Sequence, residues 1–190
     1  MSSVDSILDS KSEAYYDPAA DFSGVMPEGS YKAYATELTV KENLVIKNKY
    51  LADVYEVTFE VAKENSDNTY ERDGKEVSGK VFVGKNVKSK GFFRFKKPDP
   101  STYPGLEENS GSNKSYKELV ESFSVSLEED SEGRFFLPSV DESDIAGMPV
   151  LIDVYHSKWV DSEGKERTTP RAGAIYVWDG QKKKEEDLPF

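Results

Sequence analysis

Strict alternation over nine residues places the strongest limit on what this chain can fold into. In "VYEVTFEVA" (54–62), four apolar side chains recur at every second position and alternate with Glu or Thr. Successive side chains of a strand point to opposite faces, so this pattern predicts a half-buried β-strand and argues against a helix. The segment is the most regular in the sequence, and we read the chain first as a β protein.

Four other segments carry strand patterns. They are residues 31–40, 80–98, 145–160 and 171–179. The region 80–98 contains Gly84 and Gly91, which predict bends or bulges of the kind that let a strand serve a closed barrel.

One segment, residues 115–127, has apolar side chains at helical spacing. Ser115 is its expected N-cap, and Glu118 would complete a capping box. Residues 64–79 are polar and rich in turn formers, which predicts a loop with a small hairpin at Asp73-Gly74.

The predicted order is strand, strand, strand, helix, strand, strand. That is the order of the OB-fold, a mainly β, five-stranded Greek-key barrel with one helix between the third and fourth strands. A rolled α+β domain would give the same order and stays open as an alternative. The expected organisation is an N-terminal arm (1–25), an OB-fold domain (26–179) and an acidic C-terminal tail (180–190).

Composition excludes several classes of protein. The 190 residues include no cysteine, so disulfides, thiol catalysis and Cys-ligated zinc are excluded. No apolar run approaches the roughly 18 residues that span a bilayer. The N-terminal sequence has neither the basic start nor the apolar stretch of a signal peptide. We therefore expect a soluble cytoplasmic protein with no membrane partner and no cofactor.

Positive charge is concentrated in one window. The formal net charge is −11, yet residues 79–98 contain seven bases and no acid. The rest of the chain therefore carries −18, the difference between −11 and +7. The seven bases, here called the basic cluster, are Lys80, Lys85, Lys88, Lys90, Arg94, Lys96 and Lys97.

Phenylalanines are interleaved with these bases. A single alternating strand would direct one set of side chains inward, namely Val81, Val83, Phe93 and Phe95. It would direct the other set outward, namely Lys80, Phe82, Phe92, Arg94 and Lys96. Exposed cations and rings suit single-stranded nucleic acid, because cations neutralise phosphates and rings stack on unpaired bases.

The loops after strands one and four flank the binding face of an OB-fold. The candidate contacts in these loops are Lys47, Lys49 and Tyr50, then Lys158, Trp159, Lys165, Arg167 and Arg171. Trp159 is the best stacking candidate because it sits in a polar segment. A purely structural interpretation is also open, in which lysines blunt a strand edge and the phenylalanines belong to the core.

Residues 185–190, "EEDLPF", resemble the C-terminal tip of bacterial single-stranded DNA-binding proteins, an acidic run ending Asp-Ile-Pro-Phe. The resemblance implies that this tip docks on replication and repair proteins, with the final Phe in an apolar pocket. The implied partner contacts are Asp187, Leu188, Pro189 and Phe190. An acidic tail is also expected to compete with DNA for the basic cluster.

The body is similar to small phage proteins encoded near replication or recombination genes. The similarity rests on "DSILD" (5–9), "PEGSY" (27–31) and "DIAGMPVLIDV" (144–154). It implies a non-enzymatic phage single-stranded DNA-binding protein that acts in DNA replication, recombination or repair in the infected bacterial cell and can form a homo-oligomer. The short linker to the tip and the large polar insertions depart from the bacterial proteins and argue against their tetramer.

Other functions stay open. An acidic interaction protein, such as a DNA mimic, would fit the −18 outside the basic cluster, and a virion structural protein is not excluded. Glu163-Gly164-Lys165 matches the E-x-K element of some metal-dependent nucleases, with Asp153 upstream. We expect a turn at this element instead.

Overall fold

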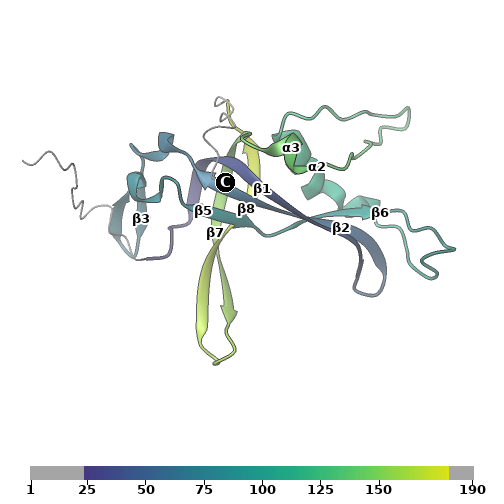
Figure 1. Ribbon diagram of the computed structural model, residues 1–190, viewed down its shortest axis with the longest axis horizontal. Helices are drawn as coiled ribbons and strands as arrows, with labels where there is room; N and C mark the ends of the chain where they lie inside the picture. The colour runs from purple at the N-terminus through teal and green to yellow at the C-terminus, as the bar shows by residue number, and fades with distance from the viewer. Residues whose placement is uncertain (1–23, 180–190) are drawn as a thin grey trace, which may run out of the picture.

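The computed structural model describes residues 24–179, which fold around a closed five-stranded barrel (Figure 1). The barrel strands are β1 (Gly29–Ile46), β2 (Tyr50–Val61), β5 (Asn86–Ser89), β7 (Pro149–Val160) and β8 (Glu166–Val177). They follow the order β1-β7-β8-β5-β2, and the β1–β2 pairing closes the ring. Only β5–β8 is parallel. The predicted mainly β, OB-like barrel is confirmed.

Smaller elements fill the connections. These are η1 (Lys63–Asn65), β3 (Thr69–Arg72), β4 (Lys75–Ser78), η2 (Gly79–Phe82), β6 (Phe92–Lys96), η3 (Ser110–Asn113), α2 (Lys114–Ser122) and α3 (Glu142–Ile145). The expected hairpin at Asp73-Gly74 is confirmed as the β3–β4 turn, and both turn residues have positive φ, 51° and 73°. Helix α2 lies between β6 and β7 in the chain, as predicted.

The core follows from the alternating segment of β2. Tyr55, Val57, Phe59 and Val61 are each at most 1% exposed. Full burial of each such side chain stabilises the fold by about 1.5–3 kcal/mol. Helix α2 covers part of this core, where it buries Leu119 and Val120 among other side chains.

The expectation of one strand over 80–98 is wrong. The segment divides into η2, β5 and β6, separated at Gly84 and Gly91, whose φ angles are +75° and +89°. Gly91 also lies close to β2, because a Cβ atom there would meet the Val54 side chain at 3.3 Å. The two glycines thus break the strand rather than merely bending it.

The expected capping box at Ser115 is also wrong. Helix α2 begins at Lys114, and Asn113 occupies the N-cap position without a side-chain cap bond. The Asn113 side chain is engaged with the backbone of Phe95 instead. A capping box does occur at α3, between Asp141 and Asp144.

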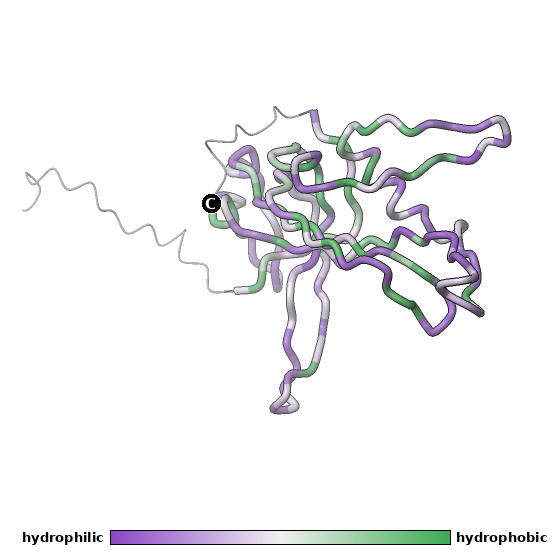
Figure 2. The backbone as a smooth tube through the Cα atoms, turned by 45° about the vertical axis from the view of Figure 1, so that its right-hand side comes forward, coloured by the Kyte–Doolittle hydropathy of each residue, from purple (hydrophilic) through white to green (hydrophobic). Residues whose placement is uncertain are grey.

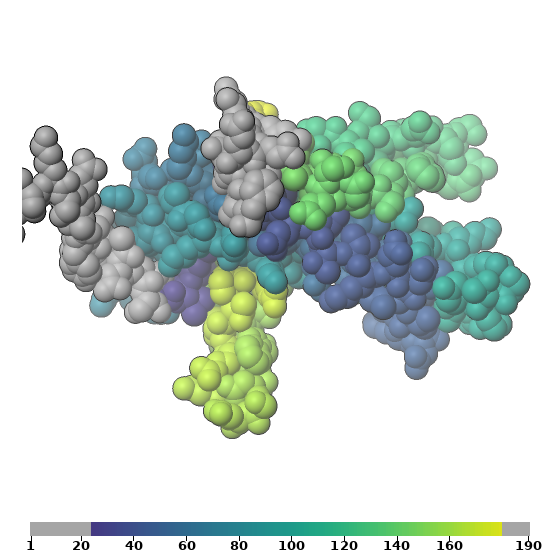
Figure 3. Space-filling view, in the orientation of Figure 1, coloured from purple at the N-terminus to yellow at the C-terminus, as the bar shows by residue number. Residues whose placement is uncertain are grey.

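Two hairpins extend beyond the barrel. The β7–β8 hairpin projects from the body, and so does the far end of β1–β2 (Figures 1 and 3). The turn-rich connection expected after residue 160 is short, because pairing continues to Val160–Glu166. Hydrophobic stretches gather in the body, whereas the projecting hairpin is largely hydrophilic (Figure 2). Over residues 24–179, no helix is long and apolar enough to cross a membrane.

Candidate nucleic-acid interface

Two cations lie side by side where β5 pairs with β8. Lys88 of β5 and Arg171 of β8 are partners in the parallel pairing. The next pair, Ser89 and Ala172, is buried, so alternation directs Lys88 and Arg171 to the outer face. Within residues 24–179 neither side chain forms an ion pair. Adjacent like charges destabilise a sheet, so a bound anion here would offset a repulsion.

The β7–β8 hairpin continues this outer face. Trp159 pairs with Arg167, and Tyr155 pairs with Arg171. Directly opposed residues of an antiparallel pair share a face, so the rings and guanidinium groups lie together. Trp159 is 50% exposed, and its Nε1 donates to Oγ1 of Thr169 at 2.9 Å. The bond holds the indole on the hairpin while half of its surface stays accessible for stacking.

The other predicted cations of this hairpin have local partners. Lys158 Nζ lies 3.4 Å from a Glu166 carboxylate oxygen, and Arg167 Nε donates to Asp161 at 2.7 Å. The Lys165 backbone N–H and then the Arg167 side chain lower the pKa of Asp161 by hydrogen bonding. The Lys165 side chain is exposed in the turn. Arg167 therefore stabilises the turn through Asp161 and also lies on the outer face beside Trp159.

An aromatic row runs along β6. Phe93 and Phe95 stack with ring centroids 5.9 Å apart and planes 18° apart, and Tyr50 meets Phe95 edge-on at 6.0 Å. Phe93 is 37% exposed. Alternation along a single strand would direct Phe93 and Phe95 inward, so this row was not predicted. The row depends on the register of β6 with β2, in which Phe92 lies opposite the core residue Tyr55.

The predicted outward orientation of Phe82 and Phe92 is wrong. Phe82 is 0% exposed and Phe92 is 3% exposed, and both belong to the core. Phe82 lies in η2, where strand alternation does not apply. Strand β6 restarts after Gly91 with Phe92 opposite Tyr55, and a one-residue offset exchanges the two faces of a strand.

Arg94 and Lys96 were also expected to face outward, and this is wrong for the same reason. Both contact Asp53, whose side chain is 5% exposed. Arg94 Nη1 lies 3.2 Å from one carboxylate oxygen and Lys96 Nζ lies 2.7 Å from the other. Arg94 Nε also donates to the Leu137 carbonyl at 3.0 Å. These ion pairs hold β6 to β2, so the two cations are not available to neutralise a phosphate.

The turn between β1 and β2 presents the remaining predicted cations. Lys47 is exposed and has a positive φ of 53°. Lys49 Nζ lies 3.1 Å from Glu107 and 5.3 Å from the centroid of the Tyr50 ring. Hydrogen bonds to Glu107 and then Tyr50 raise the pKa of the Lys49 ammonium, which stays charged at neutral pH. The turn thus places positive charge at the end of the aromatic row.

The structure spreads the basic cluster along β2. Lys80 lies in η2, and the Lys85 carbonyl accepts the Val61 N–H at one end of β2. Lys96 pairs with Leu51 near the other end. At about 3.3 Å per residue, these two ends of β2 are roughly 30 Å apart. The window is therefore a track, not a single patch.

Lys88 and Lys90 lie in the middle of this track and are both exposed. The Lys90 backbone N–H donates to the carbonyl of Ala172 at 3.1 Å, which keeps it beside β8. We call the combined surface the outer-face strip. It comprises Tyr50, Lys88, Lys90, Phe93, Phe95, Tyr155, Trp159, Arg167 and Arg171.

The residues of the nuclease alternative are not brought together. Glu163 and Lys165 lie in the hairpin turn, whereas Asp153 lies on β7 and accepts a hydrogen bond from Ser30. The seven strand positions from Asp153 to the end of β7 span about 23 Å. Among the described residues, no group of three or more Asp, Glu or His side chains could hold a metal ion.

Comparison with known proteins adds no assignment. No protein-family model matches the sequence, and no curated protein shows significant similarity to it. The partner contacts predicted at residues 187–190 lie outside the described residues, as does nearly all of the predicted arm. The interface is therefore inferred from the geometry of residues 24–179.

Proposed function

We propose that this chain binds single-stranded DNA with little sequence preference along the outer-face strip. The observation that supports this most is the adjacency of Lys88 and Arg171 on the outer surface of an OB-like barrel. The pair joins the middle of the basic cluster to the Trp159 hairpin. Cations so placed neutralise phosphates, and each ring can stack on a base for about 1–3 kcal/mol.

The strip provides stacking surfaces and cations rather than a set of polar groups aimed at base edges. Every base has a π-face, so stacking tolerates any sequence. The proposed ligands are therefore the single-stranded intermediates of phage DNA replication, recombination and repair. We further propose that residues 187–190 recruit replication or recombination proteins, on the strength of the sequence resemblance alone.

Tryptophan fluorescence titration tests the proposal. Oligo(dT), a hairpin duplex and single-stranded RNA are each added at two salt concentrations. We expect oligo(dT) to quench the fluorescence, with an affinity that falls steeply as salt rises, because cations follow the phosphates. The W159F variant keeps Trp178 as an internal reference and should lose most of the quenching.

The other outcomes are equally informative. Absence of both quenching and a mobility shift at low salt would reject the proposal and favour an acidic interaction protein. Equal affinity for the duplex and the single strand would show that base stacking does not contribute to binding. Metal-dependent cleavage of the oligonucleotide would favour the nuclease.

A further inference from the structure

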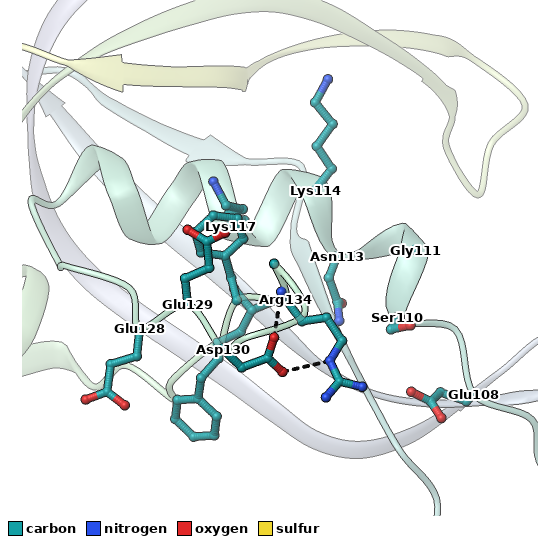
Figure 4. A pocket seen from close by; sticks show the side chains of 14 residues that line it. Glu108, Ser110, Gly111, Asn113, Lys114, Lys117, Glu128, Glu129, Asp130 and Arg134 are labelled. Atoms are coloured by element: carbon teal, nitrogen blue, oxygen red, sulfur yellow. Dashed lines mark hydrogen bonds and ion pairs between the residues drawn. The ribbon is translucent and has the colours of Figure 1, made fainter.

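A groove runs round the free edge of β6. It consists of a hollow of about 870 Å³ between α2 and residues 128–137, and a smaller one of about 370 Å³ beside β6. The two share the lining residues Glu108, Asn113, Phe135, Phe136 and Leu137. In Figure 4, Asp130 and Arg134 lie bonded in the groove between α2 and the segment that carries Glu108.

The groove exposes two phenylalanine rings. Phe136 is 67% exposed and Phe135 is 43% exposed. Phe135 lies under the ammonium of Lys117, at 4.3 Å from Nζ to the ring centroid. An antiparallel bridge between Glu129 and Phe135 pairs the two sides of the segment 128–137. The folded core does not account for the exposure of Phe136.

At Phe95 the edge of β6 is closed to an added strand. The Asn113 side chain accepts from the Phe95 N–H at 2.7 Å and donates to the Phe95 carbonyl at 3.0 Å. These are the backbone groups that a peptide would need for strand addition. A ligand beside Phe95 therefore meets side chains, as a nucleic-acid strand does.

The charged side chains of the groove leave Lys97 available to an anion. The cations that line it are Arg94, Lys96, Lys97, Lys114, Lys117 and Arg134. The acids are Glu108, Glu128, Glu129 and Asp130. Five of these cations have a carboxylate partner: Arg94 and Lys96 meet Asp53, Lys114 meets Glu118, Lys117 meets Glu121, and Arg134 meets Asp130. Lys97 is exposed and makes no ion pair within residues 24–179.

We propose that the groove is a second subsite for single-stranded DNA, continuous with the outer-face strip. Phe95 belongs to both, since it stacks on Phe93 and also lines the smaller hollow. The strand passes from Phe95 over Lys97 and stacks a base on Phe136. This inference rests on the proposed function and extends the path of the DNA from the outer-face strip to the segment 128–137.

Oligonucleotide length separates the two subsites. The site sizes of OB-folds range from about 4 to 16 nucleotides, so oligo(dT) of about 6 and about 16 nucleotides serve as short and long probes. We expect F136L to leave the affinity for the short probe unchanged and to weaken the long probe about fivefold or more, because leucine cannot stack. F136W keeps a ring and should retain the wild-type affinity for both.

Equal effects of F136L on both probes, or no effect on either, would overturn the inference. Failure of the wild type to bind the short probe would instead reject the proposed function. As a second measurement, oligo(dT) with a photoreactive base at either end should cross-link to the peptide containing Phe136. Cross-linking confined to β6 and the β7–β8 hairpin would leave the groove to another ligand, such as a peptide, and would reject the subsite.

Discussion

Asp53 and Lys96 form an ion pair of 2.7 Å that ties the buried side of β2 to β6. Arg94 meets the other oxygen of the same carboxylate at 3.2 Å. The backbone N–H of Asn43 on β1 donates to Asp53 as well, at 2.9 Å. One carboxylate therefore organises three strands and holds two cations of the basic cluster.

Replacing Asp53 should destabilise the fold. D53N leaves Arg94 and Lys96 partly buried without their anion, so we expect the free energy of unfolding to fall by about 2–4 kcal/mol. Urea denaturation measures this. D67N removes an exposed carboxylate and should stay within about 0.5 kcal/mol of the wild type. Equal stability of the two variants would mean that Asp53 has no organising role.

Removing the cations at the barrel junction should weaken DNA binding and spare stability. We expect K88A and R171A each to lower the slope of log affinity against log salt by about 1, because each removes one phosphate contact. K75A, in the β3–β4 hairpin, should leave the slope unchanged. Salt titrations of oligo(dT) binding test this, and an unchanged slope in R171A would count against a phosphate contact there.

Neighbouring phenylalanines of β6 should behave differently when truncated. F92A empties a core position and should cost about 3–5 kcal/mol of stability. F93A removes an exposed ring and should weaken oligo(dT) binding about 5- to 100-fold. Thermal unfolding and fluorescence titration separate the two effects. If F92A weakened binding and F93A lowered stability instead, the single alternating strand expected from the sequence would be supported.

Acid should loosen the tip of the β7–β8 hairpin. Hydrogen bonds from Lys165 and Arg167 lower the pKa of Asp161, so its ionised form is favoured in the folded turn. The stabilisation is present above the unfolded pKa of about 3.9 and is lost as the pH falls through the lower, folded pKa. NMR of the Trp159 indole N–H should follow this loss. In D161N the signal should not show this transition.

Removing the acidic tip should strengthen DNA binding. The tail is expected to compete with DNA for the outer-face strip, so deletion of residues 185–190 should tighten oligo(dT) binding, most at low salt. It should also abolish recruitment of partner proteins. If deletion leaves the DNA affinity unchanged, only the docking role of the tip remains. Titrations of the full chain and the deletion variant at two salt concentrations measure the difference.

The sequence predicted the barrel because its signals are local. Alternation over residues 54–62 and one helical segment between the third and fourth strands were enough to give the order of elements. The OB-like barrel followed from that order through the known topology of the fold. Trp159 could be predicted as exposed because polar residues surround it.

The faces of β6 could not be predicted, because they depend on a break at Gly91 that alternation cannot see. An offset of one residue there moved Phe93 outward and Phe92 inward. Asp53 was missed for a related reason. It lies in a buried strand beside Ala52 and Val54, and its partners follow it by about forty positions in the sequence. Only the register of β2 with β6 brings the three charges together.

Closure of the barrel also fixes when the strip comes into existence during synthesis of the chain. Lys88 lies in β5 and Arg171 lies in the middle of β8, the last barrel strand, and their adjacency depends on a parallel pairing of two residues on each side. Ala172 must leave the exit tunnel of the ribosome before this pairing can form. A nascent chain therefore carries Lys88 of β5 without Arg171 beside it, and the proposed DNA-binding strip becomes continuous in the same step that completes the barrel.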